Sequence, residues 1–240
     1  MAAELAHFFG ALGTEVSIIC RGPFLLRAED EDVSRRFTEV YDRTFDLHLN
    51  SFVSKGSKDG DDIALEVAKG GDTFTVRADT LLFATGRVPN TDLLDVQNTG
   101  VQIDEFLETN VPGIWALGDI VGKYMLKHSA NLEAAYVANN MFNPDDKVPV
   151  DYHAMPHAIF SSPQVAGVGV TEEEAKEQEL DYTSATYDYF DTAYGSSIDD
   201  RDGFVKVLAH PHTREILGCH ITGARHLSSY RGRSTPCVHA

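Results

Sequence analysis

Apolar side chains at helical spacing open the chain, and a β-branched run follows them. Residues 4–12 (ELAHFFGAL) place apolar positions every three to four residues, which predicts a helix that Gly13 ends. Residues 15–20 (EVSIIC) then predict a strand. Helix, glycine and strand in this order form half of a βαβ unit, and the strand and glycine loop of the other half are not among these residues.

The pattern continues as alternating helix and strand signals. Residues 33–43 predict a second helix, and the turn at 69–72 (KGGD) predicts a hairpin. The run at 80–85 (TLLFAT) is continuously apolar, which is typical of a strand buried in a parallel sheet. The other predicted strands of this part are residues 47–49, 63–67 and 73–76.

The second half changes character. A short apolar strand is predicted at 114–117 and a helix at 130–142. From 156 to 223, strands and turns surround one helix that begins at the capping box of residues 171–174 (TEEE). We therefore predict an α/β fold that ends in a separate α+β domain.

The chain is strongly acidic. Its 240 residues carry a formal net charge of −17, and such a surface repels phosphate backbones, which excludes non-specific nucleic-acid binding. The acids gather in short clusters that are typical either of ordinary solvated surface or, as we favour, of halophilic proteins, in which salt screens the self-repulsion. These clusters are residues 29–32, 59–62, 172–174 and 199–202.

Membrane and secreted classes fit poorly. No apolar run approaches the length of a membrane span, and the first ten residues lack the basic region of a signal peptide. The three cysteines, Cys20, Cys219 and Cys237, are too few and too scattered for a disulfide framework. We therefore expect a cytoplasmic protein without a membrane partner.

Candidate chemistry begins with Arg21 and Arg27, which follow the strand at 15–20. At the end of the second strand of a dinucleotide-binding domain, arginines accommodate a 2′-phosphate with charge-assisted hydrogen bonds. The alternative is that both arginines pair with the acids at 29–32, and from these residues alone that alternative is preferred.

Two further glycine loops follow apolar strands. Gly118-Asp119 could bring a carboxylate close to sugar hydroxyls, although the same dipeptide is common in turns. Residues 84–90 (ATGRVPN) suit either a cofactor that crosses a sheet edge or a domain crossover.

The histidines point only weakly to chemistry. His210 and His212 have the spacing of metal ligands, but they lie in a predicted turn without supporting carboxylates or cysteines, so we predict no metal site. His128 precedes a helix whose first backbone N–H groups could face an anionic ring or a phosphate.

Together these pieces resemble one family. TNVPGIWALGD at 109–119, LKHSANLEA at 126–134 and FSSPQVAGVGVTEEEA at 160–175 follow ATGRVPNT at 84–91 in the order found in the flavoprotein disulfide reductases. The resemblance covers residues 1–223. Within the family, residues 20–27, 124–134 and 188–195 look most like a reductase of mycothione.

The resemblance implies partial Rossmann-like NAD(P) and FAD domains, followed by an α+β dimerisation domain, and a set of cofactor contacts. Asp119 would bind a ribityl hydroxyl of FAD, the backbone of 125–127 would face the flavin ring, and the arginines would favour NADPH over NADH. Implied FAD contacts are Gly118, Asp119, Met125, Leu126 and Lys127. Implied NADPH contacts are Glu4, Arg21, Arg27, Ala84 and Gly86. Implied domains are 1–86 for NAD(P), 87–152 for the second FAD segment and 153–223 for the homodimer interface.

The implied reaction passes hydride from NADPH to FAD and then electrons to a low-molecular-weight disulfide such as mycothione, or a γ-glutamylcysteine-type disulfide in a halophile. The chain departs from the family because it holds neither a Cys-x4-Cys pair nor the C-terminal His-Pro segment, so we assign no catalytic residue. The alternatives are a non-catalytic remnant that folds partly or dimerises, and a dihydrolipoamide dehydrogenase-like NAD enzyme.

The last segment, residues 224–240, differs from the rest of the chain. It contains three arginines and no acidic residue. We interpret it as a tail outside the evolved fold.

Overall fold

The computed structural model describes residues 1–96, 100 and 102–224, and most of the predicted tail therefore lies outside the described residues. The chain divides into two compact units. The first unit combines residues 1–84 with the chain from residue 156 onward, and the second unit holds residues 85–155.

The first unit opens with the predicted alternation of helix and strand. The elements are α1 (Ala2–Ala11), β1 (Ser17–Ile19), α2 (Glu31–Thr44) and β2 (Asp46–His48). β1 and β2 pair in parallel, with Ile18 opposite Leu47. The Asp30 carboxylate caps α2 by accepting the Asp32 N–H at 3.1 Å. The two predicted helices and the strands predicted at 15–20 and 47–49 are thus confirmed, and their ends differ by a few residues.

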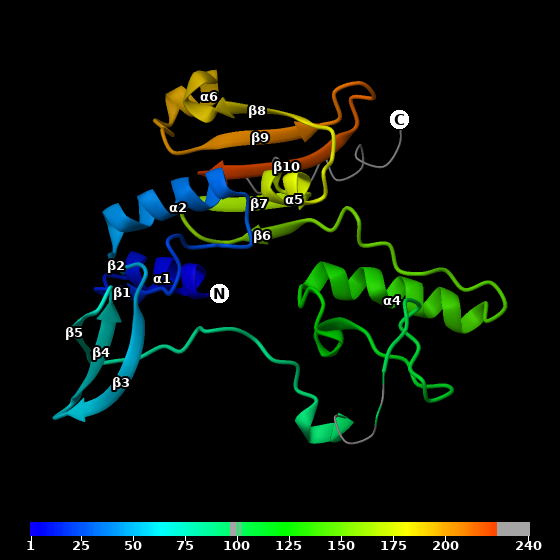
Figure 1. Ribbon diagram of the computed structural model, residues 1–240, viewed down its shortest axis with the longest axis horizontal. Helices are drawn as coiled ribbons and strands as arrows, with labels where there is room; N and C mark the ends of the chain where they lie inside the picture. The colour runs from blue at the N-terminus through cyan, green and yellow to red at the C-terminus, as the bar shows by residue number, and fades with distance from the viewer. Residues whose placement is uncertain (97–99, 101, 225–240) are drawn as a thin grey trace. The chain divides into compact units, whose positions relative to one another are not determined.

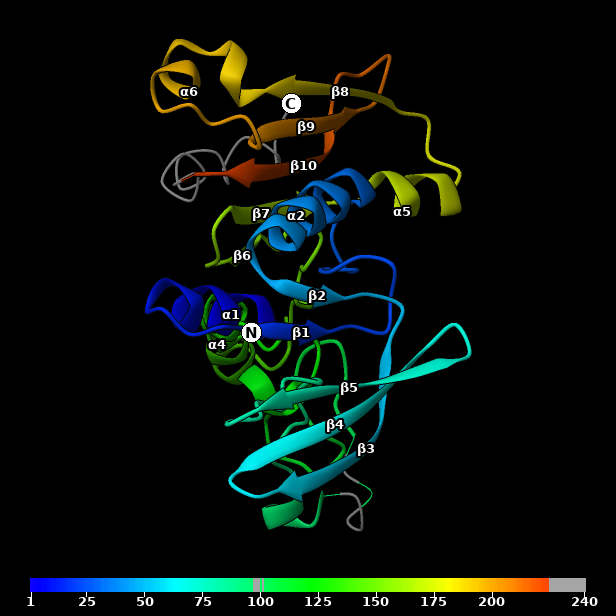
Figure 2. The same ribbon diagram turned by 90° about the vertical axis from the view of Figure 1, so that its left-hand side faces the viewer.

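An antiparallel sheet of order β3-β4-β5 follows (Figure 2). Its strands are β3 (Phe52–Asp59), β4 (Asp62–Lys69) and β5 (Asp72–Ala78), and the last two contain the predicted strands. β3 escapes sequence analysis because every one of its residues is exposed, so no buried face imposes an alternating pattern.

The prediction of a buried strand at 80–85 is wrong. Residues 80–84 form no strand and take part in no backbone ladder of the described chain. Leu82 is 53% exposed and Phe83 is 78% exposed. A strand needs a neighbour to satisfy its N–H and C=O groups, and among the described residues the parallel sheet contains only β1 and β2.

The rest of the first unit is a five-stranded antiparallel sheet of order β6-β7-β10-β9-β8 (Figure 1). The strands are β6 (His157–Ile159), β7 (Gln164–Gly169), β8 (Thr183–Asp188), β9 (Phe204–Ala209) and β10 (Ile216–Gly223). The helices α5 (Glu172–Glu177) and α6 (Ala193–Ser197) and the short turn η3 (Tyr189–Asp191) complete it. The capping box at Thr171 and Glu174 is confirmed.

One hydrophobic core joins α1 and α2 to this sheet. Phe37 and Tyr41 of α2 are fully buried, with ring centroids 4.2 Å apart, and they share a cluster with Val165 of β7 and Phe204 of β9. Both views show α2 lying against the sheet (Figures 1 and 2). The amino-terminal elements therefore depend on the sheet for their burial.

A buried lysine adds an ionic connection at the same boundary. The Lys206 ammonium, 3% exposed, lies 2.9 Å from an Asp30 oxygen and 2.6 Å from oxygens of Asp32 and Glu172. Burial lowers the Lys206 pKa, but the three carboxylates outweigh it and raise the pKa above its usual value, so the lysine stays charged. Surface solvation, one of our two interpretations of the acid clusters, is wrong for Asp30, which is fully buried.

This network predicts acid sensitivity. The hydrogen bond from Lys206 outweighs burial and lowers the pKa of Glu172 from 4.5 to about 2. Because the folded-state pKa is the lower one, its contribution to stability is complete above pH 4.5 and is lost as the pH falls toward 2. We expect the urea midpoint to fall across this window, and Glu172→Gln to flatten the fall. Equal pH profiles for the two proteins would contradict the assignment.

The second unit is built around one helix. It contains the short turns η1 (Asp92–Leu94) and η2 (Gly118–Val121) and the helix α4 (Lys127–Phe142), which confirms the predicted helix. The prediction of a strand at 114–117 is wrong: only Trp115 pairs, in an isolated bridge to Glu108. No helix in the described part of the chain has the length and apolar character needed to cross a bilayer.

Candidate functional site

The arginine loop, residues 20–27, leaves the carboxyl end of β1 and is fixed to the segment after β2. The Ser51 N–H donates to the Cys20 carbonyl at 3.0 Å, and the Asn50 N–H donates to the Gly22 carbonyl at 3.1 Å. A cavity of about 340 Å³ opens there, lined by Arg21, Asn50, Ser51 and Phe52. Ligands of open α/β sheets bind at this end of the strands.

The structure brings the second arginine to the same loop. A Cβ atom on Gly22 would lie 2.7 Å from Cδ of Arg27, so the Arg27 stem packs on the residue next to Arg21. Both arginines are exposed. A substitution of Gly22 would displace the Arg27 stem.

The acids at 29–32 do not pair with these arginines. Within the described residues, Arg21 and Arg27 form no ion pair, whereas Glu29 bonds His157 at 2.7 Å and Glu31 pairs with Arg35. Asp30 and Asp32 bond Lys206, as described above. The alternative interpretation of the arginines is therefore not observed, and both guanidinium groups remain available to an anion.

Glu4 lies in the first turn of α1. Its Oε1 accepts the Phe160 N–H at 3.0 Å. Burial tends to raise the Glu4 pKa, but this hydrogen bond and the ammonium group of Met1 outweigh it and lower the pKa. The carboxylate is therefore charged at neutral pH.

Two predicted flavin contacts are joined through a third residue. Asp119, at the start of η2 and half exposed, pairs through Oδ2 with the Arg87 guanidinium, which also donates to the Met125 carbonyl at 2.8 Å. The other carboxylate oxygen of Asp119 has no partner among the described residues and can accept a hydroxyl. Sequence analysis missed Arg87, although it lies inside the ATGRVPNT motif.

A buried carboxylate holds the loop that carries Asp119. The Gly118 N–H donates to Glu133 Oε2 at 2.5 Å, and Gly118 has a φ of +77°, which favours glycine. Glu133 is 2% exposed and also accepts the Tyr152 hydroxyl at 2.9 Å. Burial, together with this carboxylate, raises the Tyr152 pKa. The loop is thus anchored to α4.

The segment before α4 presents backbone groups. Met125 has a left-handed backbone with φ of +51°, and α4 begins two residues later at Lys127. The Leu126 N–H donates to Ser129 Oγ at 3.3 Å, and the Lys127 ammonium bonds Asn131. The first-turn N–H groups of any helix lack intrahelical acceptors and favour anionic partners.

Two predicted NADPH contacts, Ala84 and Gly86, fall in different units of the chain. Ala84 is the last residue of the first stretch of the first unit, and Gly86 belongs to the second unit. Gly86 has a φ of +144°, with open space where a Cβ would lie. Their role remains a prediction.

His210 and His212, at which we predict no metal site, lie close together in the structure. They occupy a turn between β9 and β10, with ring centroids 6.0 Å apart. Among the described residues, no group of three or more histidine, cysteine or carboxylate side chains is arranged to hold a metal ion.

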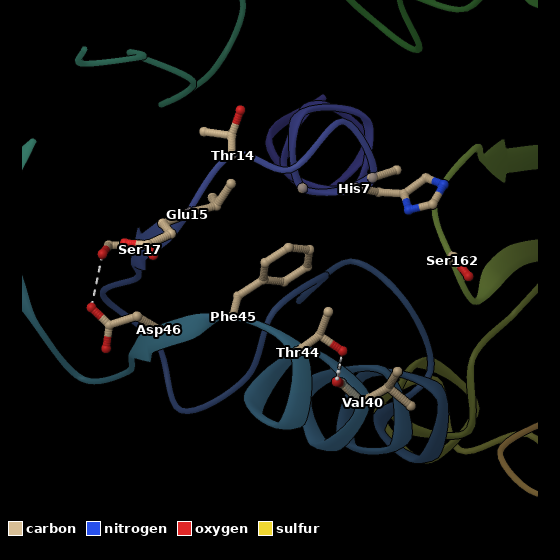
Figure 3. A pocket seen from close by; sticks show the side chains of 12 residues that line it. His7, Thr14, Glu15, Ser17, Val40, Thr44, Phe45, Asp46 and Ser162 are labelled. Atoms are coloured by element: carbon tan, nitrogen blue, oxygen red, sulfur yellow. Dashed lines mark hydrogen bonds between the residues drawn. The ribbon is translucent and has the colours of Figure 1, made fainter. Parts of the chain in front are cut away.

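A larger cavity of about 750 Å³ contains none of the predicted cofactor residues (Figure 3). It is lined by α1, the ends of α2 and of the loop before β1, and Ser162, with Phe45 at its centre (Figure 3). Asp46 on its wall accepts the Ser17 hydroxyl at 2.8 Å. This larger cavity lies at the amino ends of β1 and β2, whereas nucleotides bind at the carboxyl ends of such strands. The smaller cavity at Arg21 is therefore the stronger candidate for a nucleotide.

Comparison with known families identifies both parts of the chain. The family described as "Pyridine nucleotide-disulphide oxidoreductase" matches residues 1–135. The corresponding dimerisation domain matches residues 155–230, which extends beyond the predicted end of the fold at 223.

Curated relatives share this pattern. A mycothione reductase of Mycobacterium tuberculosis is 38% identical over 234 residues, which cover 93% of this chain and 50% of the relative. Dihydrolipoyl dehydrogenase 2 of Arabidopsis thaliana is 32% identical over 229 residues, which cover 91% of this chain and 45% of that protein. The chain thus spans about half the length of the curated relatives it matches.

Solved structures establish the fold. LpdA of Mycobacterium tuberculosis has a TM-score of 0.84 at 21% identity, covering 98% of this chain and 52% of its own. The HOCl-induced flavoprotein disulfide reductase RclA of Escherichia coli also reaches 0.84, at 23% identity, with 98% and 55% coverage. The predicted α/β class, a Rossmann-like region followed by a dimerisation domain, is confirmed.

Proposed function

Because the chain belongs to the pyridine nucleotide-disulphide oxidoreductase family, we propose that it forms part of an NADPH- and FAD-dependent reductase of a low-molecular-weight disulfide such as mycothione. The observation that carries this proposal is the arginine loop. Arg21 and Arg27 share one loop at the carboxyl end of β1, beside a cavity, and form no ion pair within the described chain.

The domain roles follow from this assignment. Residues 1–86 would contribute to the NAD(P) site, 87–152 to the FAD site and 153–223 to a homodimer interface, in the cytoplasm. The sequence similarity to the dimerisation domain supports the last of these roles. A high-salt host would be consistent with the net charge of −17.

The proposed binding of FAD is based on the loop around Asp119. When bound, FAD would relay two electrons from NADPH to a disulfide, which takes up two protons to become two thiols. The free oxygen of Asp119 would accept a ribityl hydroxyl, and Arg87 would hold that carboxylate and Met125 in place. The backbone of 125–127 would face the flavin ring.

These 240 residues contain no Cys-x4-Cys pair, so cofactor binding is a sharper test of the proposal than disulfide reduction. A second candidate, an NAD enzyme of the dihydrolipoamide dehydrogenase type, is favoured by the 32% identity to the Arabidopsis protein. The two candidates differ in whether the arginine loop recognises a 2′-phosphate.

We expect NADPH to bind at least about tenfold more tightly than NADH in calorimetric titrations, because each charge-assisted hydrogen bond contributes roughly 1.5–3 kcal/mol. The double substitution Arg21→Ala and Arg27→Ala should weaken NADPH binding by about a hundredfold and leave NADH binding unchanged. Lys58→Ala, which removes an exposed charge from β3, is the control. Equal affinities for the two nucleotides would favour the second candidate.

A further inference from the structure

We propose that two buried hydroxyls of α2, on Ser34 and Thr38, are positioning residues for nucleotide recognition. They hold the second half of the arginine loop so that Arg27 lies beside Arg21. The inference rests on the proposed function for the identity of the ligand, a dinucleotide with a 2′-phosphate. Neither hydroxyl would touch the nucleotide, and each would act through the backbone of the loop.

The two hydroxyls stand on the buried face of α2. Ser34 is 3% exposed and Thr38 is 5% exposed. A buried hydroxyl costs free energy unless a partner replaces its hydrogen bonds to water. The partners of these two side chains therefore explain why the buried face of the helix is not wholly apolar. That face consists of Val33, Ser34, Phe37, Thr38 and Tyr41.

The partners lie in the arginine loop. The Leu25 N–H donates to Thr38 Oγ1 at 2.9 Å, and Ser34 Oγ donates to the Leu26 carbonyl at 2.8 Å. Ser34 Oγ also lies 3.4 Å from the Glu29 carbonyl, which is the longer contact. The Thr38 hydroxyl donates its own hydrogen to the Ser34 carbonyl at 2.7 Å, so its lone pairs are left for the loop. Together the two hydroxyls fix two consecutive residues of the loop.

The backbone of Leu26 determines where Arg27 lies. Leu26 has a φ of +53°, a left-handed conformation that is uncommon for leucine. Its carbonyl accepts the Glu29 N–H at 2.9 Å as well as the Ser34 hydroxyl. Arg27 follows directly, and its stem packs on Gly22, where a Cβ would lie 2.7 Å from Arg27 Cδ. The turn that α2 stabilises thus brings Arg27 back to the residue next to Arg21.

The two arginines have separate anchors. The half of the loop that carries Arg21 is held by the segment after β2, through the carbonyls of Cys20 and Gly22. The half that carries Arg27 is held by α2. Loss of the α2 anchor should therefore release Arg27 and leave Arg21 in place. Restricting a side chain before binding lowers the conformational entropy that is lost on binding, so the anchor should raise the affinity for the phosphate.

Thr38→Val keeps the shape of the side chain and removes the acceptor of the Leu25 N–H. We expect it to weaken NADPH binding roughly three- to tenfold in calorimetric titrations and to leave NADH binding unchanged. Ser34→Ala should have an effect of similar size, and Thr38→Ser, which keeps the hydroxyl, should preserve the preference for NADPH. An equal loss for the two nucleotides would overturn the proposal, because a merely structural role would affect both.

The matched control is Thr44→Val. Thr44 is the exposed last residue of the same helix, and its hydroxyl bonds the Val40 carbonyl at 2.8 Å, four residues earlier, as Thr38 bonds Ser34. Its substitution should leave both affinities unchanged. Hydrogen exchange at the Leu25 amide should be faster in Thr38→Val and unaltered in Thr44→Val. Unaltered exchange in Thr38→Val would contradict the anchoring role.

A double-mutant cycle tests whether Thr38 acts through Arg27. In an Arg27→Ala protein, Thr38→Val should weaken NADPH binding no further. In an Arg21→Ala protein, Thr38→Val should still weaken it, because Arg27 remains to be positioned. Additive losses from Thr38→Val and Arg27→Ala would overturn the proposal, since independent effects add.

Inorganic phosphate separates this proposal from the proposed function, because it carries the charge of the 2′-phosphate without the dinucleotide. We expect phosphate to protect Arg27 from phenylglyoxal, as read by peptide mass spectrometry, and Thr38→Val to raise the required concentration roughly three- to tenfold. If this holds while the unsubstituted protein binds NADPH and NADH equally, the proposed function is wrong and the positioning role stands. Equal protection of the two proteins would overturn the positioning role. If phosphate protects neither protein and NADPH is not preferred, both proposals are wrong.

Discussion

Lys206→Met is expected to lower the free energy of unfolding by about 3–5 kcal/mol, because it leaves the buried Asp30 carboxylate without its counter-charge. The ammonium group is 3% exposed and bonds Asp30, Asp32 and Glu172 at once. Asp30 is fully buried and cannot recover the loss through water. Urea denaturation followed by far-ultraviolet circular dichroism measures the change.

The matched control is Lys176→Met. Lys176 pairs with the same Glu172 at 3.3 Å, but it is 60% exposed, so its removal should change the free energy of unfolding far less than the removal of Lys206. Adding Asp30→Asn and Glu172→Gln to Lys206→Met should restore part of the stability, because the unpaired charges are then removed. A loss below about 1 kcal/mol for Lys206→Met alone would show that the network is solvated.

Phe37→Ala is expected to destabilise the first unit by about 3–5 kcal/mol. The Phe37 side chain is fully buried and stacks on Tyr41 in the core that α2 shares with β7 and β9. The substitution opens a cavity at the boundary between the amino-terminal elements and the five-stranded sheet, so both should unfold at a lower urea concentration.

Phe142→Ala provides the comparison for this core substitution. Phe142 ends α4 and is 85% exposed, so its loss should change stability by less than about 0.5 kcal/mol. Hydrogen exchange follows α2 and the sheet separately. If Phe37→Ala speeded exchange in α2 alone and left exchange in the sheet unchanged, the shared core would be disproved.

Sequence patterns correctly predicted the helices and caps that depend on residues close together in the chain. The helix at 33–43 has a strong apolar face, and the capping box at Thr171 and Glu174 forms as its residue types indicate. The strand predicted at 80–85 failed because an apolar run indicates burial without saying which neighbour covers it. β3 was missed for the opposite reason, since its residues are all exposed.

The sequence predicted the motifs of the candidate site one by one. It did not predict the contacts between them. Nothing in the sequence links Arg87 to Asp119 and Met125, which the structure joins through one guanidinium. Likewise, Asp30 and Lys206 are 176 residues apart, so the acid cluster at 29–32 resembled solvated surface. Long-range pairing of this kind leaves no periodic signal.

The capping residue of α2 has a consequence for synthesis of the protein. Asp30 forms the amino end of α2 and also bonds Lys206, which the ribosome adds 176 residues later. Translation at roughly 5–20 residues per second separates the two by about ten seconds or more. During that interval the first helices exist without the surface that covers them, so this chain completes its amino-terminal packing only after β9 has left the exit tunnel.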